Sequence, residues 1–436
     1  MKGNRRTNNQ GRKLGVLLVC ALLTLAVPNA WAQEQVAPQR LQLKTYHPKP
    51  PADLNIEQIK TDLKTNGFSP AIPLPLWTYT VTSSRDGNQY SGVMVGASPF
   101  DSNGNKNVSI PGYIVPLIIV TNSVAVANHH GLITTAPGMT TFDPTQATNC
   151  LSAPNNVPST LIAQSPLFQA VDFVFGGVDV GTTQYVDAFQ RSNFWVALGE
   201  NGIRDTYHVA LSPVETLQPV MVNVPADRGL SVNNGFFFGP PAFCAPFGMI
   251  DFGWLDAYLQ STVIPALHAQ GVGPGNLPMF LLSNVVEAGQ YNNRGTCCTL
   301  GYHNITGPSG VLFQTYLVSE FDSSLIWRSL SFHGPAIHDS AIWSHEIGEW
   351  MNDPTQGNPV PAWGHIGQQS GCQGNLEVGD PLTGTPMPAV TMSNGYTYHL
   401  QELADFSWFL GNDPLGVNGW YSDNGTLLTN AGPVCQ

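Results

Sequence analysis

A short helix is predicted by the segment Asp339-Ser-Ala-Ile-Trp-Ser-His-Glu-Ile-Gly-Glu-Trp-Met-Asn-Asp-Pro354, which carries the most informative residues of the chain. Asp339 or Ser340 can cap its first turn with a side-chain oxygen, and the closing Asp-Pro pair predicts its end. Within it, His345 and Glu349 are four residues apart. Their side chains therefore project from one face of the helix, about one turn apart.

His345 begins the pattern His-Glu-x-x-Glu, which is the zinc-peptidase pattern His-Glu-x-x-His with a carboxylate in place of the second histidine. Zinc accepts imidazole nitrogen and carboxylate oxygen alike, so His345 and Glu349 are candidate metal ligands. Glu346 points to the side of this pair. It is the candidate general base, taking a proton from metal-activated water that attacks a peptide carbonyl. The alternative is an ordinary amphipathic helix whose charged residues face solvent.

A catalytic zinc ion needs a third protein ligand, and three downstream residues are candidates. Glu377 ranks first and Asp380 second, because Glu377-Val-Gly-Asp380 contains the only pair of acids in an acid-poor stretch. His365 ranks third. If Glu377 binds the metal, Asp380 orients a ligand or shapes the loop. The alternative is that both acids lie on a solvated turn.

Peptide hydrolysis also needs a donor for the negative charge that develops on the carbonyl oxygen. Tyr302 and His303 are candidates on a predicted strand before the helix, and His338 is a third, seven residues before His345. Each has an ordinary structural alternative. Oxygen ligands also suit calcium, so the main alternative function is non-catalytic binding by an extracellular or cell-wall protein with a structural Zn²⁺ or Ca²⁺ ion.

The N-terminus predicts a secretory signal peptide. Basic residues from Lys2 to Lys13 precede the apolar run Leu14–Val27, which is short for a membrane span, and Ala30-Trp-Ala32 fits a cleavage site after Ala32. We therefore expect an extracellular or periplasmic protein. Cleavage leaves 12 basic and 29 acidic residues, a formal charge of −17, which argues against nucleic acid or anionic membrane as a partner. An extracellular protein or peptide substrate, or a cell-wall polysaccharide, is the expected partner.

The composition favours a strand- and loop-rich exported protein. Charged residues make up only 11% of the chain, which contains 44 Gly and 35 Pro. An even number of cysteines outside the signal peptide predicts disulfides, although their pairing stays open. These cysteines are Cys150, Cys244, Cys297, Cys298, Cys372 and Cys435.

Hydrophobic periodicity predicts several elements. Two expected helices are Thr183–Trp195 and the segment from Leu255 to Leu267, ended by Gly271. Residues 213–250, rich in Pro, Gly and Phe, are expected to be irregular. The expected strands are a hairpin from Trp77 to Val95, the buried run Ile114–Val120, and residues 279–282, 301–303 and 314–318.

The motifs from the strand at 298–303 to Glu377-Val-Gly-Asp380 resemble a group of secreted microbial proteins with the pattern S-H-E-x-x-E…D-P…E-x-G-D. This group is similar in part to the plant EXORDIUM (phosphate-induced) proteins. The resemblance covers roughly residues 279–435. It implies a zincin-like metallopeptidase site in which His345, Glu349 and one acid of the E-x-G-D motif bind zinc, with Glu346 as base.

The expected fold class is therefore α/β (α+β) and zincin-like, with a mixed sheet, an active-site helix, many loops and disulfides. A loosely ordered arm or pro-segment is expected over 33–75, a β-rich half over 76–250, and a zincin-like half over 251–436. The function expected from this organisation is that of a secreted zinc-dependent peptidase.

Overall fold

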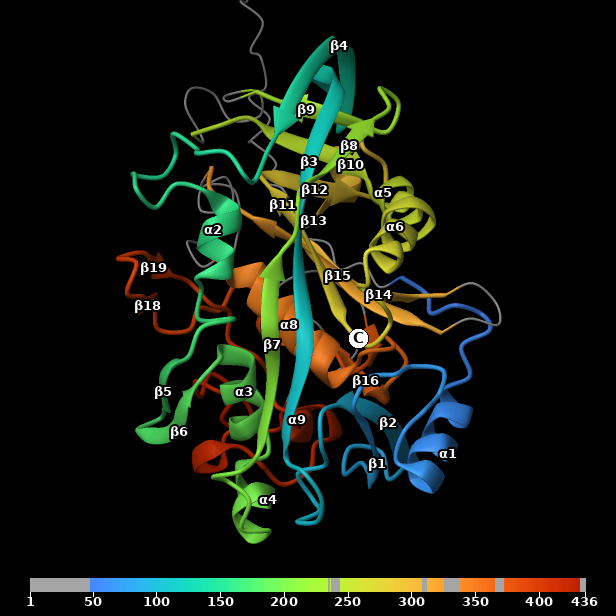
Figure 1. The fold of residues 1–436 in the computed structure, drawn as a ribbon, viewed down its shortest axis with the longest axis vertical. Coiled ribbons are helices and arrows are strands. Elements are labelled where there is room, and N and C mark those ends of the chain that lie inside the picture. Colours follow the sequence, from blue (N-terminus) through green and yellow to red (C-terminus); the bar gives the residue numbers. More distant parts are fainter. Residues whose placement is uncertain are drawn as a thin grey trace, which may run out of the picture. The chain divides into compact units, whose positions relative to one another are not determined.

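The computed structural model describes residues 48–233, 236, 244–307, 312–324, 337–364 and 372–431. These residues form a strand-rich, mixed α/β structure with short helices and one eleven-stranded mixed sheet (Figure 1). Among them, no helix combines the length and apolar character that crossing a membrane requires. The expected signal peptide and residues 33–47 lie outside the described residues.

One long strand, β3 (Asn107–His129), organises the sheet. Its partners are β4 (Leu132–Phe142), β7 (His208–Thr216), β8 (Val220–Val224), β9 (Gly229–Val232) and β11 (Leu277–Ser283). All run parallel to β3 except β4, which forms an antiparallel hairpin with it. The predicted strand Ile114–Val120 is confirmed as part of β3. Because four partners are parallel, most of the pairing joins segments far apart in the chain.

Beyond β11 the sheet continues through β15 (Gln314–Phe321) to β14 (Gly301–Thr306). β11 and β15 are parallel, whereas β14 and β15 are antiparallel. These three strands confirm the predicted strands at 279–282, 301–303 and 314–318. This end of the sheet matters most for the site, because β14 carries His303.

The expectation that residues 213–250 are irregular is wrong for most of the described residues of this range. They contain the end of β7, then β8, β9 and β10 (Phe247–Asp251). β10 pairs with β9 and with β12 (Val285–Ala288), which in turn pairs with β13 (Cys297–Thr299). These strands are short and gain their order by pairing with β3 and its neighbours, a tertiary effect that local composition does not show.

Helices cover both faces of the β11–β15–β14 region (Figure 1). On one face lies α8 (Ala341–Asn352), the predicted helix with the His-Glu-x-x-Glu pattern. On the other lie α5 (Phe252–Tyr258), a π-helical turn and α6 (Ile264–Ala269), which confirm the predicted helix at 255–267. Residues alternate between the two faces along each strand, as a pleated sheet requires: Met279 packs towards α8 and Phe280 towards α5 and α6.

Near the N-terminal end of the described chain, the predicted hairpin is confirmed as β1 (Leu76–Thr82) and β2 (Gln89–Val95). The expected loosely ordered arm is wrong for residues 56–66, which form α1 (Ile56–Asn66). Asn55 caps this helix by accepting a hydrogen bond from the Gln58 amide, and Gly67 ends it in a left-handed conformation.

The predicted helix at 183–195 is confirmed as α3 (Tyr185–Asn193).

Disulfides are present as expected: Cys150 is bonded to Cys244, and the adjacent Cys297 and Cys298 are bonded to each other. Cys372 is also disulfide-bonded, and Cys435 lies outside the described residues. The remaining elements are α2 (Pro158–Ala163), β5 (Val171–Phe175), β6 (Val178–Thr183), α4 (Trp195–Glu200), β16 (Pro359–Gly364), β17 (Cys372–Asn375), β18 (Val390–Thr391), β19 (Thr397–Tyr398) and α9 (Phe406–Leu410).

Candidate metal centre

The site is built on α8, which is buried along its whole length. Apolar side chains such as Trp343 and Trp350 anchor it in the core, and Trp350 Nε1 donates a hydrogen bond to Thr315 Oγ1 on β15. His345 is only 6% exposed and Glu346 and Glu349 only 3%. The alternative of an amphipathic helix with a solvated charged face is therefore wrong, and these charged groups need partners inside the protein.

Six buried side chains converge at the middle of α8, and we call them the His–carboxylate cluster. They are His303, His345, Glu346, Glu349, Glu377 and Asp380. His303 comes from β14, three members come from α8, and the last two come from the loop after β17. Two overlapping triplets of this cluster have ligand atoms close enough together to hold a metal ion, one with His345 and Glu346 and one with His303 and Glu377; Glu349 belongs to both.

His345 faces carboxylates with its Nε2 atom. This atom lies 3.0 Å from Glu349 Oε1, 3.6 Å from Asp380 Oδ1 and 4.0 Å from Glu346 Oε1. On the other side of the ring, the Gln401 amide nitrogen lies 3.0 Å from Nδ1 and donates to the Gly379 carbonyl at 2.7 Å. Gln401 thus fixes the ring so that Nε2 points into the cluster. Sequence reasoning missed this residue, since no local pattern marks it.

Gly379 explains the glycine of the E-x-G-D motif. A Cβ atom at this position would lie 2.5 Å from Cγ of His345, so the imidazole packs directly on the backbone. The amides of Gly379 and Asp380 both donate to Glu349 Oε1 at 3.2 Å. The loop therefore positions both candidate ligands of the helix as well as adding its own carboxylate.

His303 closes the other side of the cluster. Its Nε2 lies 2.9 Å from the Asp353 carbonyl oxygen, and its Nδ1 lies 3.7 Å from Glu349 Oε2 and 3.8 Å from Glu346 Oε2. Glu377 Oε2 lies 3.9 Å from His303 Nε2. Two residues earlier on β14, a Cβ atom at Gly301 would lie 2.8 Å from Cγ of Glu346, so the strand leaves room for that side chain.

The concentration of carboxylates changes the proton affinity of the cluster. Burial by itself lowers the pKa of His345, but Glu349, Glu346 and Asp380 outweigh it and raise the pKa to about 10. Burial also raises the pKa of Glu346 well above its ordinary value, and the nearby carboxylates add to this effect. The Oε2 atom of Glu346 is buried and has no hydrogen-bond partner among the described residues. Such a cluster is suited to bind cations, by protonation or by coordination of metal.

The other predicted site residues lie elsewhere. Tyr302 points to the opposite face of β14 from His303 and packs against Phe252 at a ring distance of 4.6 Å, in the core beneath α5. His338 stacks on His399 at 3.5 Å, next to Asp339. His365 lies outside the described residues.

His338, Asp339 and His399 form a separate triplet with metal-ligand spacing at the start of α8. Here Asp339 already accepts several hydrogen bonds: Oδ2 contacts His399 Nδ1 at 2.6 Å, and Oδ1 accepts the His399 amide at 3.0 Å and the hydroxyl and amide of Ser340. Its carboxylate therefore joins the helix start to residue 399.

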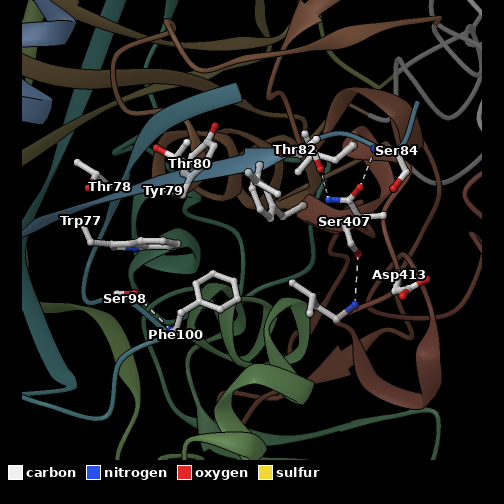
Figure 2. A pocket seen from close by; sticks show the side chains of 15 residues that line it. Trp77, Thr78, Tyr79, Thr80, Thr82, Ser84, Ser98, Phe100, Ser407 and Asp413 are labelled. Atoms are coloured by element: carbon white, nitrogen blue, oxygen red, sulfur yellow. Dashed lines mark hydrogen bonds between the residues drawn. The ribbon is translucent and has the colours of Figure 1, made fainter. Parts of the chain in front are cut away.

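A pocket of about 660 Å³ lies beside β1, which supplies several of the residues that line it (Figure 2). Trp77 and Phe100 line it, with Ser407 and Asp413 from the C-terminal part of the chain. None of the His–carboxylate cluster residues lines this pocket. Pocket and cluster are therefore separate features.

Comparisons with known proteins give no assignment: no family model matches the chain, and neither a curated protein nor a solved structure is significantly similar to it. The chemistry of the His–carboxylate cluster is therefore argued from its own geometry.

Proposed function

We propose that the protein is an exported metallopeptidase with a zincin-like site, in which His345, Glu349 and Asp380 hold a zinc ion. The observation that carries the proposal is the convergence of Glu349 Oε1 and Asp380 Oδ1 on His345 Nε2, at 3.0 and 3.6 Å. Asp380 replaces Glu377 as the preferred third ligand because Asp380 lies against His345, whereas Glu377 lies against His303. Zinc accepts imidazole nitrogen and carboxylate oxygen, and a catalytic site needs three such protein ligands.

Glu346 is proposed as the general base. A bound zinc ion supplies a Lewis acid, which lowers the pKa of water and polarises a carbonyl group. Glu346 would accept the proton of the attacking water on its carboxylate, whose Oε1 atom lies 4.0 Å from His345 Nε2 and whose buried Oε2 atom has no hydrogen-bond partner among the described residues. It would then return the proton to the departing amine, because peptide hydrolysis requires the leaving nitrogen to be protonated.

A second candidate function is non-catalytic, with a metal that stabilises the fold of an extracellular binding protein. The burial of the cluster favours it, since His345 is its most exposed member at 6%. Zinc or calcium suits this role, because the cluster offers four carboxylates as well as two imidazoles.

The test compares wild type with Glu346→Gln and with Asp423→Asn, a buried acid outside the cluster. Metal content is measured by elemental analysis, and cleavage is measured on a mixed peptide library. We expect Glu346→Gln to keep its metal and lose about 10²–10⁴-fold in cleavage rate, as removal of a general base does. Asp423→Asn should keep both. Metal without cleavage in wild type would favour the structural role, and absence of metal would overturn the peptidase proposal.

A further inference from the structure

We propose that the His–carboxylate cluster is a two-ion centre, in which Glu349 bridges the zinc site at His345 to a second site for a divalent transition-metal ion formed by His303 and Glu377. This inference deepens the proposed function, because it uses the same cluster, but it does not require peptidase activity.

The two oxygens of Glu349 face different imidazoles. Oε1 lies 3.0 Å from His345 Nε2, and Oε2 lies 3.7 Å from His303 Nδ1. Glu346 also lies between the two imidazoles, but its contacts of 4.0 Å to His345 and 3.8 Å to His303 are both longer, and it stays the base and not a ligand. A carboxylate between two imidazoles is placed to give one oxygen to each of two ions, and two-metal hydrolytic sites hold their ions about 3.5–4 Å apart.

The orientation of His303 fits a ligand. Its Nε2 atom is placed to donate to the Asp353 carbonyl at 2.9 Å, and its own carbonyl accepts a hydrogen bond from Gln356 Nε2. Nδ1, which faces Glu346 and Glu349, is then the nitrogen that can coordinate an ion. Glu377 Oε2 lies 3.9 Å from Nε2, and His303, Glu349 and Glu377 each offer a ligand atom within 4.8 Å of the others. Ligand histidines commonly donate their second ring N–H to a carbonyl or carboxylate in this way.

The spacing favours an ion over a direct ion pair at His303. Contacts of 3.7 and 3.8 Å from Nδ1 to Glu349 and Glu346 are longer than the 2.7–3.2 Å of an N–H···O hydrogen bond. Ligand atoms placed 2.0–2.2 Å from a tetrahedral ion lie roughly 3.3–3.6 Å apart, close to these separations.

The charge of the cluster and the hydrogen bonding of Glu346 also favour two ions. The cluster contains four carboxylates, and one divalent ion balances the charge of two of them, whereas two ions balance all four. Buried charge that is left unbalanced is costly. Glu346 adds an independent indication, because its Oε2 atom, on a side chain only 3% exposed, has no hydrogen-bond partner among the described residues and points towards His303.

Metal stoichiometry tests the proposal. The full mature chain is dialysed against Zn²⁺, and its ion content is measured by elemental analysis, with near-ultraviolet circular dichroism to confirm folding. We expect about two ions per chain in wild type and about one in Glu377→Gln and in His303→Gln, since each variant alters the second site alone. The matched control is His399→Ala, in the separate triplet beside Asp339, which should keep both ions.

Manganese provides a second readout. Two Mn²⁺ ions that share Glu349 should give an exchange-coupled paramagnetic resonance spectrum, and Glu377→Gln should show the spectrum of an isolated ion. About one ion in wild type, two ions in both second-site variants, or loss of an ion in His399→Ala would each overturn the proposal. Two coupled ions without peptide cleavage would support the two-ion centre and overturn the proposed peptidase function. Peptide cleavage with about one ion per chain would support the peptidase function and overturn the two-ion centre.

Discussion

The protein buries carboxylates in two regions, and the surroundings that stabilise the buried carboxylates differ between them. One is the His–carboxylate cluster. The other, which we call the loop-acid cluster, consists of Glu402, Asp405 and Asp423. In the loop-acid cluster, hydrogen-bond donors of the protein surround two of the three carboxylates: Glu402 accepts from the amides of Asn424 and Thr426 and from two hydroxyls, and Asp423 accepts from the Tyr185 hydroxyl and the Leu403 amide. Asp405 Oδ1 has no hydrogen-bond partner among the described residues, and the pKa of this acid is raised instead. Burial of acids therefore does not by itself indicate a metal.

The His–carboxylate cluster differs in what its oxygens face. Glu346 and Glu349 direct oxygens towards two imidazoles and towards other carboxylates. Acceptors that face one another are stabilised by a cation, whereas acceptors that face N–H and O–H donors are already satisfied. The useful criterion is thus the kind of atom that surrounds a buried carboxylate.

Removal of metal by a chelator should give the largest difference between the two regions, because only the His–carboxylate cluster is expected to lose stability. If metal binds only the folded chain, its removal lowers the free energy of unfolding by about 4 kcal/mol when the free ion had been at a thousandfold excess over Kd. Thermal unfolding with and without chelator measures the difference. His345→Ala serves as the control. Because this variant lacks a ligand of the proposed zinc site, chelator should lower its melting temperature less than that of wild type. Equal melting temperatures in wild type would contradict a metal role for this cluster.

Glu402→Ala should destabilise the loop-acid cluster without affecting metal content. The substitution removes the buried carboxylate that accepts from the amides of Asn424 and Thr426 and from two hydroxyls, and the loss of these hydrogen bonds to a charged group costs about 3 kcal/mol. Chemical denaturation measures this cost, and Glu402→Gln, which keeps one acceptor oxygen, should recover part of it. A loss of bound metal in Glu402→Ala would show that the two regions are not separate.

Gly379→Ala should damage the metal centre through its backbone. The new Cβ would lie 2.5 Å from Cγ of His345, so the loop or the ring must shift. We expect a destabilisation of about 1–3 kcal/mol, typical of overpacking, together with weaker metal binding. Gly374→Ala is a matched control, because the nearest heavy atom to its Cβ would be 3.8 Å away. Similar metal affinity in the two variants would contradict the role assigned to Gly379.

Asp405→Asn should have the smallest effect, and it should depend on pH. Burial, and then Asp423 and Glu402, raise the pKa of Asp405 well above its ordinary value. The folded chain therefore holds this proton more tightly than the unfolded chain, and stability is lost as pH rises through the raised pKa. The variant removes that loss, so it should be stabilised relative to wild type by roughly 1 kcal/mol near neutral pH and by less near pH 4. Melting curves across this range test it, and a difference that shrinks as pH rises would refute it.

Much of the helix and its candidate ligands could be predicted from the sequence, because helical spacing alone places His345 and Glu349 on one face. Strand periodicity also predicts that Tyr302 and His303 face opposite sides, but which of them meets α8 depends on how β14 packs. The loop acids were recognised, yet their order of preference depends on the path of the loop around Gly379. Gln401 could not be found, since it reaches His345 only in the folded structure.

The fold can likewise be predicted where local sequence signals decide the structure, and not where pairing with distant segments decides it. Strands marked by an apolar run, such as β11, were predicted, whereas β8 to β10 are short and were not recognised. For α1 the local signals existed: Asn55 precedes the helix and Gly67 follows it, as an N-cap and a C-terminal glycine do. The Pro, Gln and Lys content of the surrounding segment hid them.

The parallel pairing of β3 also sets when the metal centre can form. His303 stands on β14, which depends on β15, then on β11, and finally on β3, a strand more than 150 residues earlier in the chain. Contacts so distant in sequence raise the contact order, and chains with high contact order fold slowly. We therefore expect the candidate ligands on β14 and α8 to reach their final positions once the sheet has assembled. An ion that binds at this stage would slow unfolding more than it speeds folding, and would so increase the kinetic stability of the folded protein.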